Sequence, residues 1–461
     1  MTSKLSCRYG VDAVSVDFEK LGVPYCPHGP TILFERFYSG QKSRSFYACA
    51  VHRDKRYCPF FYWADEVTEE KQIRSKAEFE SKRPHLNRQQ LLRSLEATKE
   101  SAFSVRRYCH TCERLVLKSD TQQHEGHHVK EGVFDKELSH PTSILTPLDN
   151  RKSQAQYYFS TSTVEFLVSE LRRLSYSRVL CVGAPRLHEA LLQNDDITSM
   201  LLDIDHRYAQ FYSQESYQCA NMFNGFFYEE EGSQICQRFL QSCVEEPIAL
   251  VIDPPFGALA TVLAHGVKKL WAMAGKELPT VLVFPYFMES HITLALPSFK
   301  MLDYQVTYDN HQHFKAHMQK HGGSKPSAVR IFTNLPPPGL VLPKEEGYSF
   351  CSICKRFVSS YNKHCPKCNS CPSKDGRLYV HCNKCSTCVK PGLVHCVKCG
   401  TCKPLVHPAC GVTEVVGCHI CGAMDHKRRD CPNKDTKLTT KKQKRASLET
   451  TATSKKKKAK H

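Results

Sequence analysis

The sequence predicts an α/β fold flanked by several small zinc-binding modules. Between about residues 150 and 337, apolar runs of β-like composition alternate with amphipathic helical segments, which is typical of a parallel-type sheet covered by helices. The chain has 25 cysteines among 461 residues, and 15 of them lie between Cys351 and Cys431, most in pairs separated by two residues. A chain of this length is too long for one ordinary core, so we expect two to four domains.

The composition limits the classes of protein to consider. No apolar run approaches the roughly 20 residues of a membrane-spanning helix, and the N-terminus lacks the apolar core of a signal peptide. We expect a soluble intracellular protein, in which thiols stay reduced and paired cysteines bind metal. The formal net charge is +18, and the 20 thiolates and seven Zn²⁺ of the sites below lower it to about +12. This favours a polyanionic partner without separating RNA, DNA, acidic protein and membrane surface.

The N-terminal part divides into a segment without a strong signal and a compact module. We expect residues 1–21 to be disordered and residues 22–68 to form the module. Its motifs follow in the order Cys26-Pro-His28, Arg44-x-Phe46-Tyr-x-Cys49 and Cys58-x2-Phe61-x-Trp63. Together they resemble a GRF-type zinc finger, and the resemblance implies the ligands Cys26, His28, Cys49 and Cys58.

Two alternatives remain within this module. His52 rivals His28 as a ligand, and the Cys-x-His spacing favours His28. GRF-type fingers often bind single-stranded nucleic acid, which needs cationic and stacking side chains. The candidates are Arg44, Phe46, Phe61 and Trp63. Packing of the small core is the other explanation, and it is favoured for Phe46 and Phe61.

A second small zinc site follows a charged linker of helical composition. The linker covers residues 69–105 and the site covers residues 106–132. The ligands fit a shortened Cys2His2 pattern, Cys109-x2-Cys112-x11-His124-x2-His127, with His128 as a substitute for His127. No basic helix of normal length follows, so we do not expect base reading in a major groove.

The expected α/β domain covers residues 150–340. Its predicted strands are 178–182, 200–204, 249–252, 281–284, 301–306 and 329–333. Pro336, Pro337 and Pro338 are expected to end the domain.

The most informative motif of this domain is Asp253-Pro254-Pro255-Phe256, directly after the apolar run 249–252. It resembles the [Asp/Asn]-Pro-Pro-[aromatic] motif of Rossmann-like class I amino-methyltransferases, which use S-adenosylmethionine (SAM). An adenine N6 amine is a poor nucleophile because its lone pair is delocalised. The Asp253 carboxylate and the Pro254 carbonyl can accept its two N–H groups, while the prolines hold these acceptors in place. Phe256 offers a stacking face, and an ordinary turn is the alternative explanation.

Weaker signals for the cofactor accompany the motif. The first strand leads into Gly183 and Arg186, and the second ends with Asp203 and Asp205, where an acidic residue normally binds ribose hydroxyls. We prefer Asp203, with Asp205 as the alternate or as a helix cap. Two more segments are expected at the adenine edge and over SAM. They are Asn221, Met222 and Phe223, and Gln156, Tyr157, Tyr158 and Phe159. Core packing is the alternative for each.

The cysteine-rich region at residues 348–412 repeats the pattern His-Cys-x2-Cys-x2-Cys. Each predicted Cys3His set joins a Cys-x2-Cys pair to the histidine and the last cysteine of the next repeat. The sets are Cys351, Cys354, His364 and Cys371; Cys365, Cys368, His381 and Cys388; Cys382, Cys385, His395 and Cys402; Cys396, Cys399, His407 and Cys410. The arrangement resembles the cysteine-rich domain of DHHC palmitoyltransferases, but the Asp-His-His-Cys tetrad and the membrane spans are missing. We expect a structural or docking role.

A zinc knuckle and a basic tail complete the chain. The knuckle at residues 416–433 has the spacing Cys418-x2-Cys421-x4-His426-x4-Cys431, which is typical of modules that bind unpaired bases, with a structural clip as the alternative. The lysine-rich tail at residues 434–461 is expected to be disordered. Its composition is typical of a nuclear or nucleolar localisation signal that also binds RNA without sequence specificity. A segment that only increases solubility is the alternative.

The order of these motifs along residues 22–432 resembles the CCHC zinc-finger methyltransferase family that makes N6-methyladenosine in large-subunit (28S) ribosomal RNA. The resemblance implies a nucleolar enzyme, also found in the cytoplasm, that methylates one adenosine in an RNA stem-loop and supports ribosome function and translation. We also expect a monomer without membrane contact, and partners among ribosome-biogenesis and RNA-helicase proteins. Two rivals are a protein lysine methyltransferase, because enzymes with Asp-Pro-Pro-Phe also modify lysine, and a non-catalytic zinc-finger RNA scaffold.

Overall fold

The chain forms two compact units, and each is described by itself. The larger unit comprises Met1–Ser360 with Lys374–Gly376, and the smaller one comprises Tyr361–Ser373 with Arg377–His461. The computed structural model describes residues 10–15, 22–37, 42–52, 55–83, 87–148, 156–193, 196–241, 246–311, 327–336, 338–405 and 407. Across these residues, no helix combines the length and the apolar character needed to cross a bilayer.

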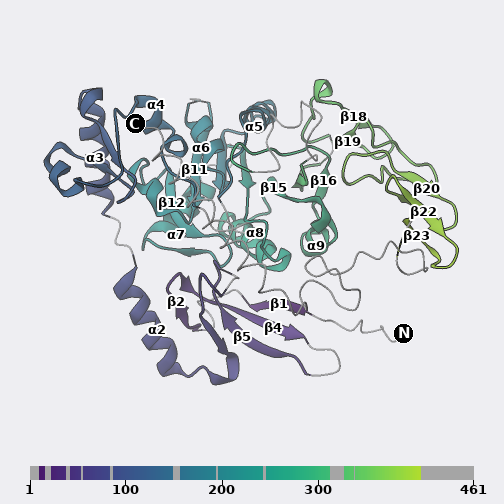
Figure 1. The fold of residues 1–461 in the computed structure, drawn as a ribbon, viewed down its shortest axis with the longest axis horizontal. Coiled ribbons are helices and arrows are strands. Elements are labelled where there is room, and N and C mark those ends of the chain that lie inside the picture. The colour runs from purple at the N-terminus through teal and green to yellow at the C-terminus, as the bar shows by residue number, and fades with distance from the viewer. Residues whose placement is uncertain are drawn as a thin grey trace, which may run out of the picture. The chain divides into compact units, whose positions relative to one another are not determined.

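The larger unit is built on an eight-stranded sheet with the order β13-β12-β11-β10-β14-β15-β17-β16 (Figure 1). The strands are β10 (Arg178–Val182), β11 (Thr198–Asp203), β12 (Tyr217–Asn221), β13 (Phe226–Phe227), β14 (Ile248–Ile252), β15 (Thr280–Pro285), β16 (Lys300–Leu302) and β17 (Val329–Thr333). The five strands from β12 to β15 in this order run parallel. Strands β13, β17 and β16 pair antiparallel at the two edges. The predicted α/β class is confirmed.

Three details of the sheet correct the predicted strands. The run predicted over residues 301–306 is a strand only in β16, and its remaining residues leave the sheet. Strand β12 was not predicted, because its sequence Tyr-Gln-Cys-Ala-Asn is too polar to read as a buried strand. The sheet is also mixed rather than wholly parallel, because the chain returns through β17 between β15 and β16.

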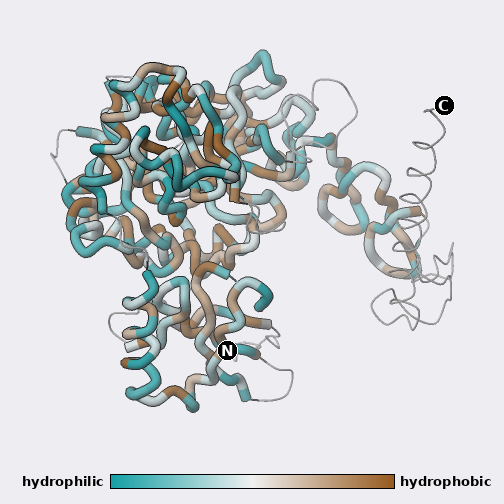
Figure 2. The backbone as a smooth tube through the Cα atoms, turned by 60° about the vertical axis from the view of Figure 1, so that its left-hand side comes forward, coloured by the Kyte–Doolittle hydropathy of each residue, from teal (hydrophilic) through white to brown (hydrophobic). Residues whose placement is uncertain are grey.

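Helices cover both faces of the sheet because its strands are apolar on both sides. Along β10, Val179 and Cys181 belong to one core and Leu180 and Val182 to the other. Helices α5 (Thr161–Arg173) and α6 (Pro185–Leu192) pack on the first core. Helices α7 (Gly232–Gln241), α8 (Ala260–Ala274) and α9 (Glu289–Ala295) pack on the second. Hydrophobic and hydrophilic stretches alternate along the tube in Figure 2.

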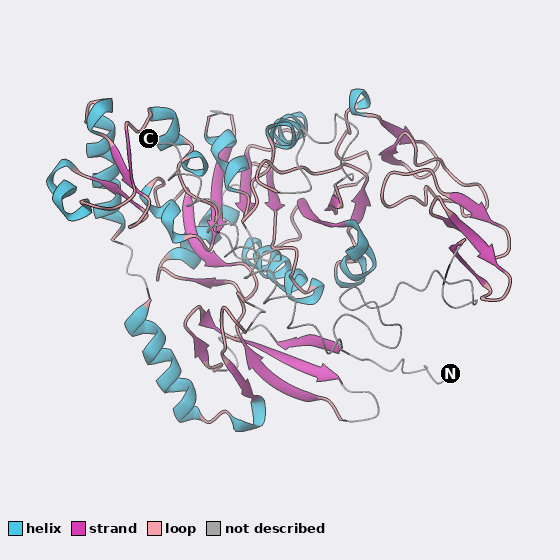
Figure 3. Ribbon diagram, viewed as in Figure 1, coloured by secondary structure: helices cyan, strands magenta, loops and turns pink. Residues whose placement is uncertain are grey.

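The N-terminal module is a separate antiparallel sheet with the order β1-β4-β5-β6 (Figure 3). Its strands are β1 (Gly10–Ser15), β4 (Ile32–Phe37), β5 (Arg44–Ala48) and β6 (Phe61–Trp63), and β2 (Tyr25–Cys26) pairs with β3 (Gly29–Pro30). Strand β1 corrects the expectation of disorder over residues 1–21 for the part that it covers. Its side chains Val11 and Ala13 pack against the module's core, which stabilises the pairing with β4.

This module shares its hydrophobic core with the α/β domain. Ile32, Phe34, Phe46 and Ala50 of the module form one buried cluster with Phe223 and Val262. Val262 lies on α8, and Phe223 follows β12. A shared core of this kind fixes the zinc finger against the domain that carries the candidate site.

The charged linker forms two helices, as its composition predicts. They are α2 (Glu69–Lys82), capped by Thr68, and α3 (Arg88–Glu100), capped by Asn87. The side chain of Arg88 turns into the α/β domain, where its Nη2 lies 2.6 Å from Glu229 Oε2. The second zinc module follows as the sheet β8-β7-β9, with strands β7 (Arg107–Cys109), β8 (Arg114–Val116) and β9 (Val129–Glu131), and is followed by α4 (Asp135–Ser139).

The cysteine-rich region is a series of hairpins. In the larger unit, β18 (Tyr348–Cys351) pairs with β19 (Arg356–Ser359). In the smaller unit, β20 (Val380–Cys382) pairs with β21 (Thr387–Val389), and β22 (Leu393–Cys396) pairs with β23 (Thr401–Pro404). In both hairpins of the smaller unit, a His-Cys pair ends the first strand, so the repeat of the sequence is also a repeat of the structure.

Candidate active site

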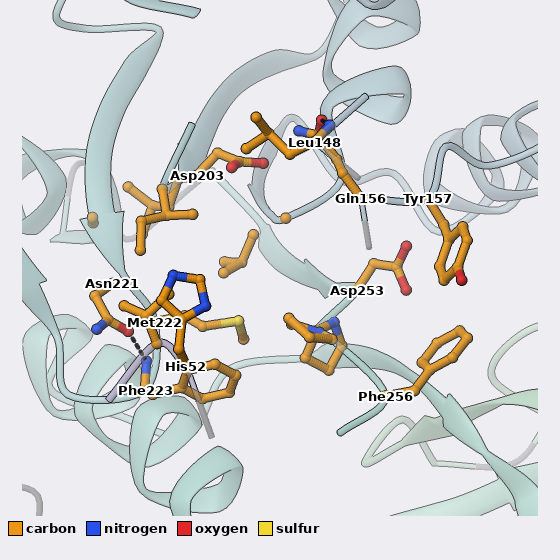
Figure 4. A pocket seen from close by; sticks show the side chains of 18 residues that line it. His52, Leu148, Gln156, Tyr157, Asp203, Asn221, Met222, Phe223, Asp253 and Phe256 are labelled. Atoms are coloured by element: carbon orange, nitrogen blue, oxygen red, sulfur yellow. Dashed lines mark hydrogen bonds between the residues drawn. The ribbon is translucent and has the colours of Figure 1, made fainter. Parts of the chain in front are cut away.

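A pocket opens at the carboxyl ends of the parallel strands, which is where open α/β sheets bind their ligands. Strands β11 and β12 end at Asp203 and Asn221, while Gly183 and Asp253 directly follow β10 and β14. Most of the predicted catalytic and cofactor residues line this one pocket (Figure 4). They are Gln156, Tyr157, Gly183, Asp203, Asn221, Met222, Phe223, Asp253, Pro254, Pro255 and Phe256.

Asp253 is held by the neighbouring strand β10 and by a distant tyrosine. Its backbone N–H donates to the carbonyl of Val182 over 2.9 Å, and its Oδ1 accepts a hydrogen bond of 2.8 Å from the hydroxyl of Tyr308. Burial raises the pKa of Asp253 well above its usual range, the hydrogen bond from Tyr308 lowers it, and the charge of Asp203 raises it. In Figure 4 the carboxylate points towards the rings of Tyr157 and Phe256.

Gly183 packs directly beneath the Asp253 motif. Its φ is +64°, in the left-handed region, and a Cβ atom at this position would lie 2.7 Å from the carbonyl oxygen of Asp253. The first strand-to-helix turn can therefore approach the motif only if residue 183 has no side chain. Because one glycine meets this need, the turn does not require a glycine-rich sequence.

Aromatic rings surround the open side of Asp253. The ring centroids of Tyr157 and Phe256 are 5.9 Å apart with a 27° angle between planes, and His311 lies 4.4 Å from Tyr157. The ring of Tyr308 meets Phe256 edge-on at 5.9 Å. Such a group of rings offers stacking faces for a flat heterocycle beside the carboxylate.

The two acidic residues after β11 have different surroundings. Asp203 lines the pocket, and burial, together with the charge of Asp205, raises the pKa of Asp203 to about 7. Asp205 is 2% exposed, lies 2.7 Å from Nη2 of Arg207, and caps the following short helix by accepting from the N–H of Arg207. Asp203 therefore faces the pocket, whereas Asp205 stabilises the loop that follows β11.

The segment after β12 forms another wall of the pocket. The Oδ1 of Asn221 accepts a hydrogen bond of 3.0 Å from the N–H of Phe223, drawn as a dashed line in Figure 4. Met222 and Phe223 then present apolar surface to the pocket. Helix α8 approaches this segment through Gly266, where a Cβ would lie 2.1 Å from the carbonyl oxygen of Met222.

Four predicted cofactor residues lie outside the pocket lining and contact residues beside the pocket. Tyr158 donates from its hydroxyl to Oε1 of Gln156 over 3.0 Å, and Phe159 is buried against Tyr308. Arg186 forms an ion pair with Asp309 and also donates to the carbonyl of Phe159. Asp205, the fourth, accepts from Nε2 of Gln156 at 3.2 Å. These contacts hold the Gln156 segment over the pocket.

Some residues of the pocket were not found from the sequence. They are Val51, His52, Leu148, Val182, Leu202, Ile204 and Ala220 in the lining, and Tyr308 as the partner of Asp253. The apolar strand ends among them could have been inferred from the strands that they finish. Nothing in the sequence around Tyr308 marks it as a partner of a residue 55 positions earlier.

The N-terminal module brings Cys26, His28, Cys49 and Cys58 together, with their ligand atoms within 4.8 Å of one another. Zn–S bonds of about 2.3 Å and Zn–N bonds of about 2.0 Å in a tetrahedral site place sulfur and nitrogen about 3.5 Å apart. Cys49 Sγ lies 3.7 Å from Nδ1 of His28, which fits this geometry. His28 rather than His52 belongs to the group. Phe46 is buried in the core and Phe61 packs against it, whereas Arg44 lies 4.0 Å over the ring of Trp63.

The second module groups Cys109, Cys112, His124 and His127 in the same way. Nδ1 of His127 lies 3.6 Å and 3.3 Å from the two sulfur atoms. His128 is not in the group, because its ring stacks on His110 with the centroids 4.8 Å apart.

In the smaller unit, two of the predicted ligand sets of the cysteine-rich region are described in full, and the structure brings the four residues of each set together. Cys365, Cys368, His381 and Cys388 form one group, and Cys382, Cys385, His395 and Cys402 form the next. The Sγ atoms of Cys368 and Cys388 are 3.6 Å apart, as are those of Cys385 and Cys402, so each group joins neighbouring repeats.

None of the three remaining predicted sets lies wholly among the described residues of one unit. In the last set of the array, Cys399 Sγ lies 3.2 Å from Nε2 of His407, and Cys410 lies outside the described residues. The set of Cys351, Cys354, His364 and Cys371 draws on both units and stays a prediction. The knuckle ligands Cys418, Cys421, His426 and Cys431 lie outside the described residues.

Comparison with known proteins places these features in one family. A family described as "Probable N6-adenine methyltransferase" matches residues 150–323, and the GRF zinc finger family matches residues 24–67. Three curated relatives are all called rRNA N(6)-adenosine-methyltransferase ZCCHC4. The relative from Homo sapiens is 47% identical, over 89% of this chain and 82% of its own. Those from Mus musculus and Xenopus tropicalis are 44% and 43% identical, over 89% of this chain and 82% and 86% of theirs. The chain belongs to the ZCCHC4 methyltransferase family.

The methyl donor of a ZCCHC4-family methyltransferase is SAM, and the pocket fits this cofactor. Asp203 stands where an acidic side chain binds ribose hydroxyls, and Gly183 leaves room for the cofactor to approach the backbone of the first turn. Val182, Met222 and Phe223 add the apolar surface that an adenine ring needs. The zinc expected of a GRF finger likewise fits the Cys3His group of the N-terminal module.

Proposed function

We propose that the chain transfers the methyl group of SAM to the N6 amine of an adenosine in ribosomal RNA, with residues 253–256 as the catalytic motif. One observation carries the proposal. The Asp253 motif and the cofactor candidates Asp203 and Gly183 line the same pocket at the ends of adjacent strands. An amine held by the motif would therefore face a methyl donor bound across these strands.

The hydrogen bond from Tyr308 gives the two oxygens of the Asp253 carboxylate different roles. Oδ1 accepts from the tyrosine, so Oδ2 is left to accept one N–H of the incoming amine. The carbonyl of Pro254 would accept the other N–H, and the two prolines fix the backbone that holds it. With both N–H groups held, the nitrogen lone pair is directed at the electrophilic methyl group that SAM supplies. Phe256 would stack on the adenine ring of the nucleotide.

We divide the pocket into a side for the methyl donor and a side for the nucleotide that accepts the methyl group. We assign Asp203 to the ribose of SAM, and Asn221, Met222 and Phe223 to the edge of its adenine. Gln156 and Tyr157 would cover the cofactor, held by Tyr158 and Asp205 behind them. The catalytic motif would then lie between the two sides, where the amine meets the methyl group.

We further propose that the substrate is a stem-loop of 28S ribosomal RNA with an accessible adenosine. The support is the printed name of the curated relatives and the basic charge, together with a zinc-finger composition suited to nucleic acid. The rival substrate is a protein lysine, which the four-residue motif alone does not separate from adenine. We place the enzyme in the nucleolus and partly in the cytoplasm, as a monomer that meets ribosome-biogenesis and RNA-helicase proteins.

One assay tests the reaction and the substrate together. Purified protein is incubated with tritiated SAM and either total RNA or a protein extract, with Asp253→Ala as the control. We expect label in RNA, in N6-methyladenosine after digestion, that disappears in the variant. Label in protein but not in RNA would favour the lysine methyltransferase instead.

A further inference from the structure

Two residues of the N-terminal zinc finger line the pocket of the α/β domain. They are Val51 and His52, which lie in the turn after β5, close to the candidate zinc ligand Cys49. Figure 4 shows the His52 side chain on the side of the pocket that carries Asn221 and Met222, across from Asp253. In the proposed division of the pocket, this is the adenine end of the methyl donor.

The candidate zinc site fixes the position of these two residues. The N–H groups of Val51 and His52 donate to Sγ of Cys49 over 3.3 Å and 3.2 Å. The His52 ring also packs edge-on against the ring of His28, with the centroids 4.4 Å apart. Two of the four candidate ligands therefore contact His52 directly, although His52 itself is not in the ligand group.

The wall beside His52 is tied to the same zinc finger. The hydroxyl of Tyr228 donates to the carbonyl of the ligand His28 over 2.8 Å, and Nδ2 of Asn224 donates to the carbonyl of Pro30 over 2.9 Å. Both residues follow β12, next to the pocket segment at residues 221–223, and Phe223 is buried in the core shared with the module. The zinc finger thus supplies two residues of the pocket lining and also contacts the segment that follows β12.

We propose that the N-terminal zinc finger is a structural part of the methyl-donor pocket, in which His52 closes the adenine end and zinc holds it in place. His52 packs on the adenine ring, and Val51 adds apolar contact. The zinc finger therefore contributes to SAM binding before any RNA is present. This inference rests on the proposed function, because it takes the pocket to be the SAM site.

The test measures SAM binding to the full-length protein by calorimetry without RNA. Loss of one stacking side chain from a cofactor site corresponds to about a tenfold weaker Kd. We expect this for His52→Ala, whereas His52→Phe, which keeps a flat ring, stays within about twofold of the wild type. The matched control is His291→Ala on the exposed face of α9, which should leave the Kd unchanged.

Zinc content is measured on the same samples by mass spectrometry. His52→Ala should keep its full zinc content, because the ligands remain. Cys58→Ser should lose one zinc and bind SAM more weakly; if that variant does not fold, the His52 pair alone decides. An unchanged Kd for His52→Ala would overturn the inference, and so would a loss of zinc from that variant, since His52 would then be a ligand.

Asp203→Ala separates this inference from the proposed function. If Asp203→Ala abolishes SAM binding and His52→Ala binds normally, the pocket assignment stands and the role of the zinc finger does not. If neither variant changes the Kd, the pocket is not the SAM site and both proposals fail.

Discussion

The hydroxyl of Tyr308 donates a hydrogen bond of 2.8 Å to Oδ1 of Asp253. It joins the catalytic motif to a segment of the chain beyond β16, and it is the polar partner of a carboxyl group whose pKa burial raises. Both the orientation and the charge of Asp253 therefore depend on a residue that the motif does not contain.

Tyr308→Phe should shift the pH dependence of methylation. The hydrogen bond lowers the pKa of Asp253, so its loss raises that pKa further. If the ionised carboxylate is the active form, activity is lost as the pH falls through this pKa. The acid limb of the kcat/KM profile should then move to higher pH, and the rate at pH 7 should fall by about tenfold. Tyr176→Phe, away from the pocket, is the control, and an unshifted limb would contradict the role given to Tyr308.

Gly183→Ala should destabilise the protein and weaken SAM binding. The new Cβ would lie 2.7 Å from the carbonyl oxygen of Asp253 and would also meet a positive φ. Gly275→Ala is a matched control, because Gly275 has a similar φ of +73° with nothing within 4 Å of a Cβ. Backbone strain alone costs about 1 to 2 kcal/mol. Thermal unfolding should show a larger loss for Gly183→Ala than for Gly275→Ala, and equal losses would mean that the turn can move away from the motif.

Arg88→Ala should lower the stability of the folded protein. It leaves Glu229 partly buried without its cation, and it removes donors to the carbonyls of Tyr212 and Tyr217. Breaking a buried ion pair from one side costs about 3 to 5 kcal/mol. Denaturant unfolding should show this loss, and the double variant Arg88→Met/Glu229→Leu should recover part of it. A double variant no better than Arg88→Ala would show that the backbone contacts dominate.

Metal analysis of the intact protein should return about seven zinc ions per chain, since each predicted set has four ligands. Cys365→Ser should remove the zinc of its own set, because that set is closed by His381 and Cys388 of the next repeat. About three ions or fewer per chain would refute the predicted ligand scheme as a whole.

Deletion of residues 418–461 should reduce RNA methylation much more than SAM binding. The deleted segment holds the predicted knuckle and the basic tail, whose expected ligand is RNA. Calorimetry with SAM and a methylation assay on the same preparation separate the two effects. Equal losses in both measurements would contradict this division of labour.

The sequence predicts best those features of the fold and the site that depend on residues close together in the chain. Strands β10 and β17 have the predicted bounds, since unbroken apolar runs mark buried strands. The ligand groups followed from spacing because Cys-x2-Cys geometry is local. The sequence did not predict that Tyr308, His52 and Leu148 belong to the pocket, because tertiary packing brings them there from other parts of the chain. The choice between Asp203 and Asp205 likewise depended on Arg207, whose direction the sequence does not reveal.

The cluster that joins Ile32 and Phe34 to Phe223 and Val262 has a practical consequence for fragments of this enzyme. A fragment cut to the region around residues 150–340 would present Phe223 and Val262 to water. Uncovered apolar surface of this kind promotes aggregation, so such a fragment should precipitate on expression. Without zinc the N-terminal module would not fold over Phe223 and Val262, and the whole chain would expose the same apolar surface. The yield of active enzyme from cells should therefore depend on the zinc supply during synthesis.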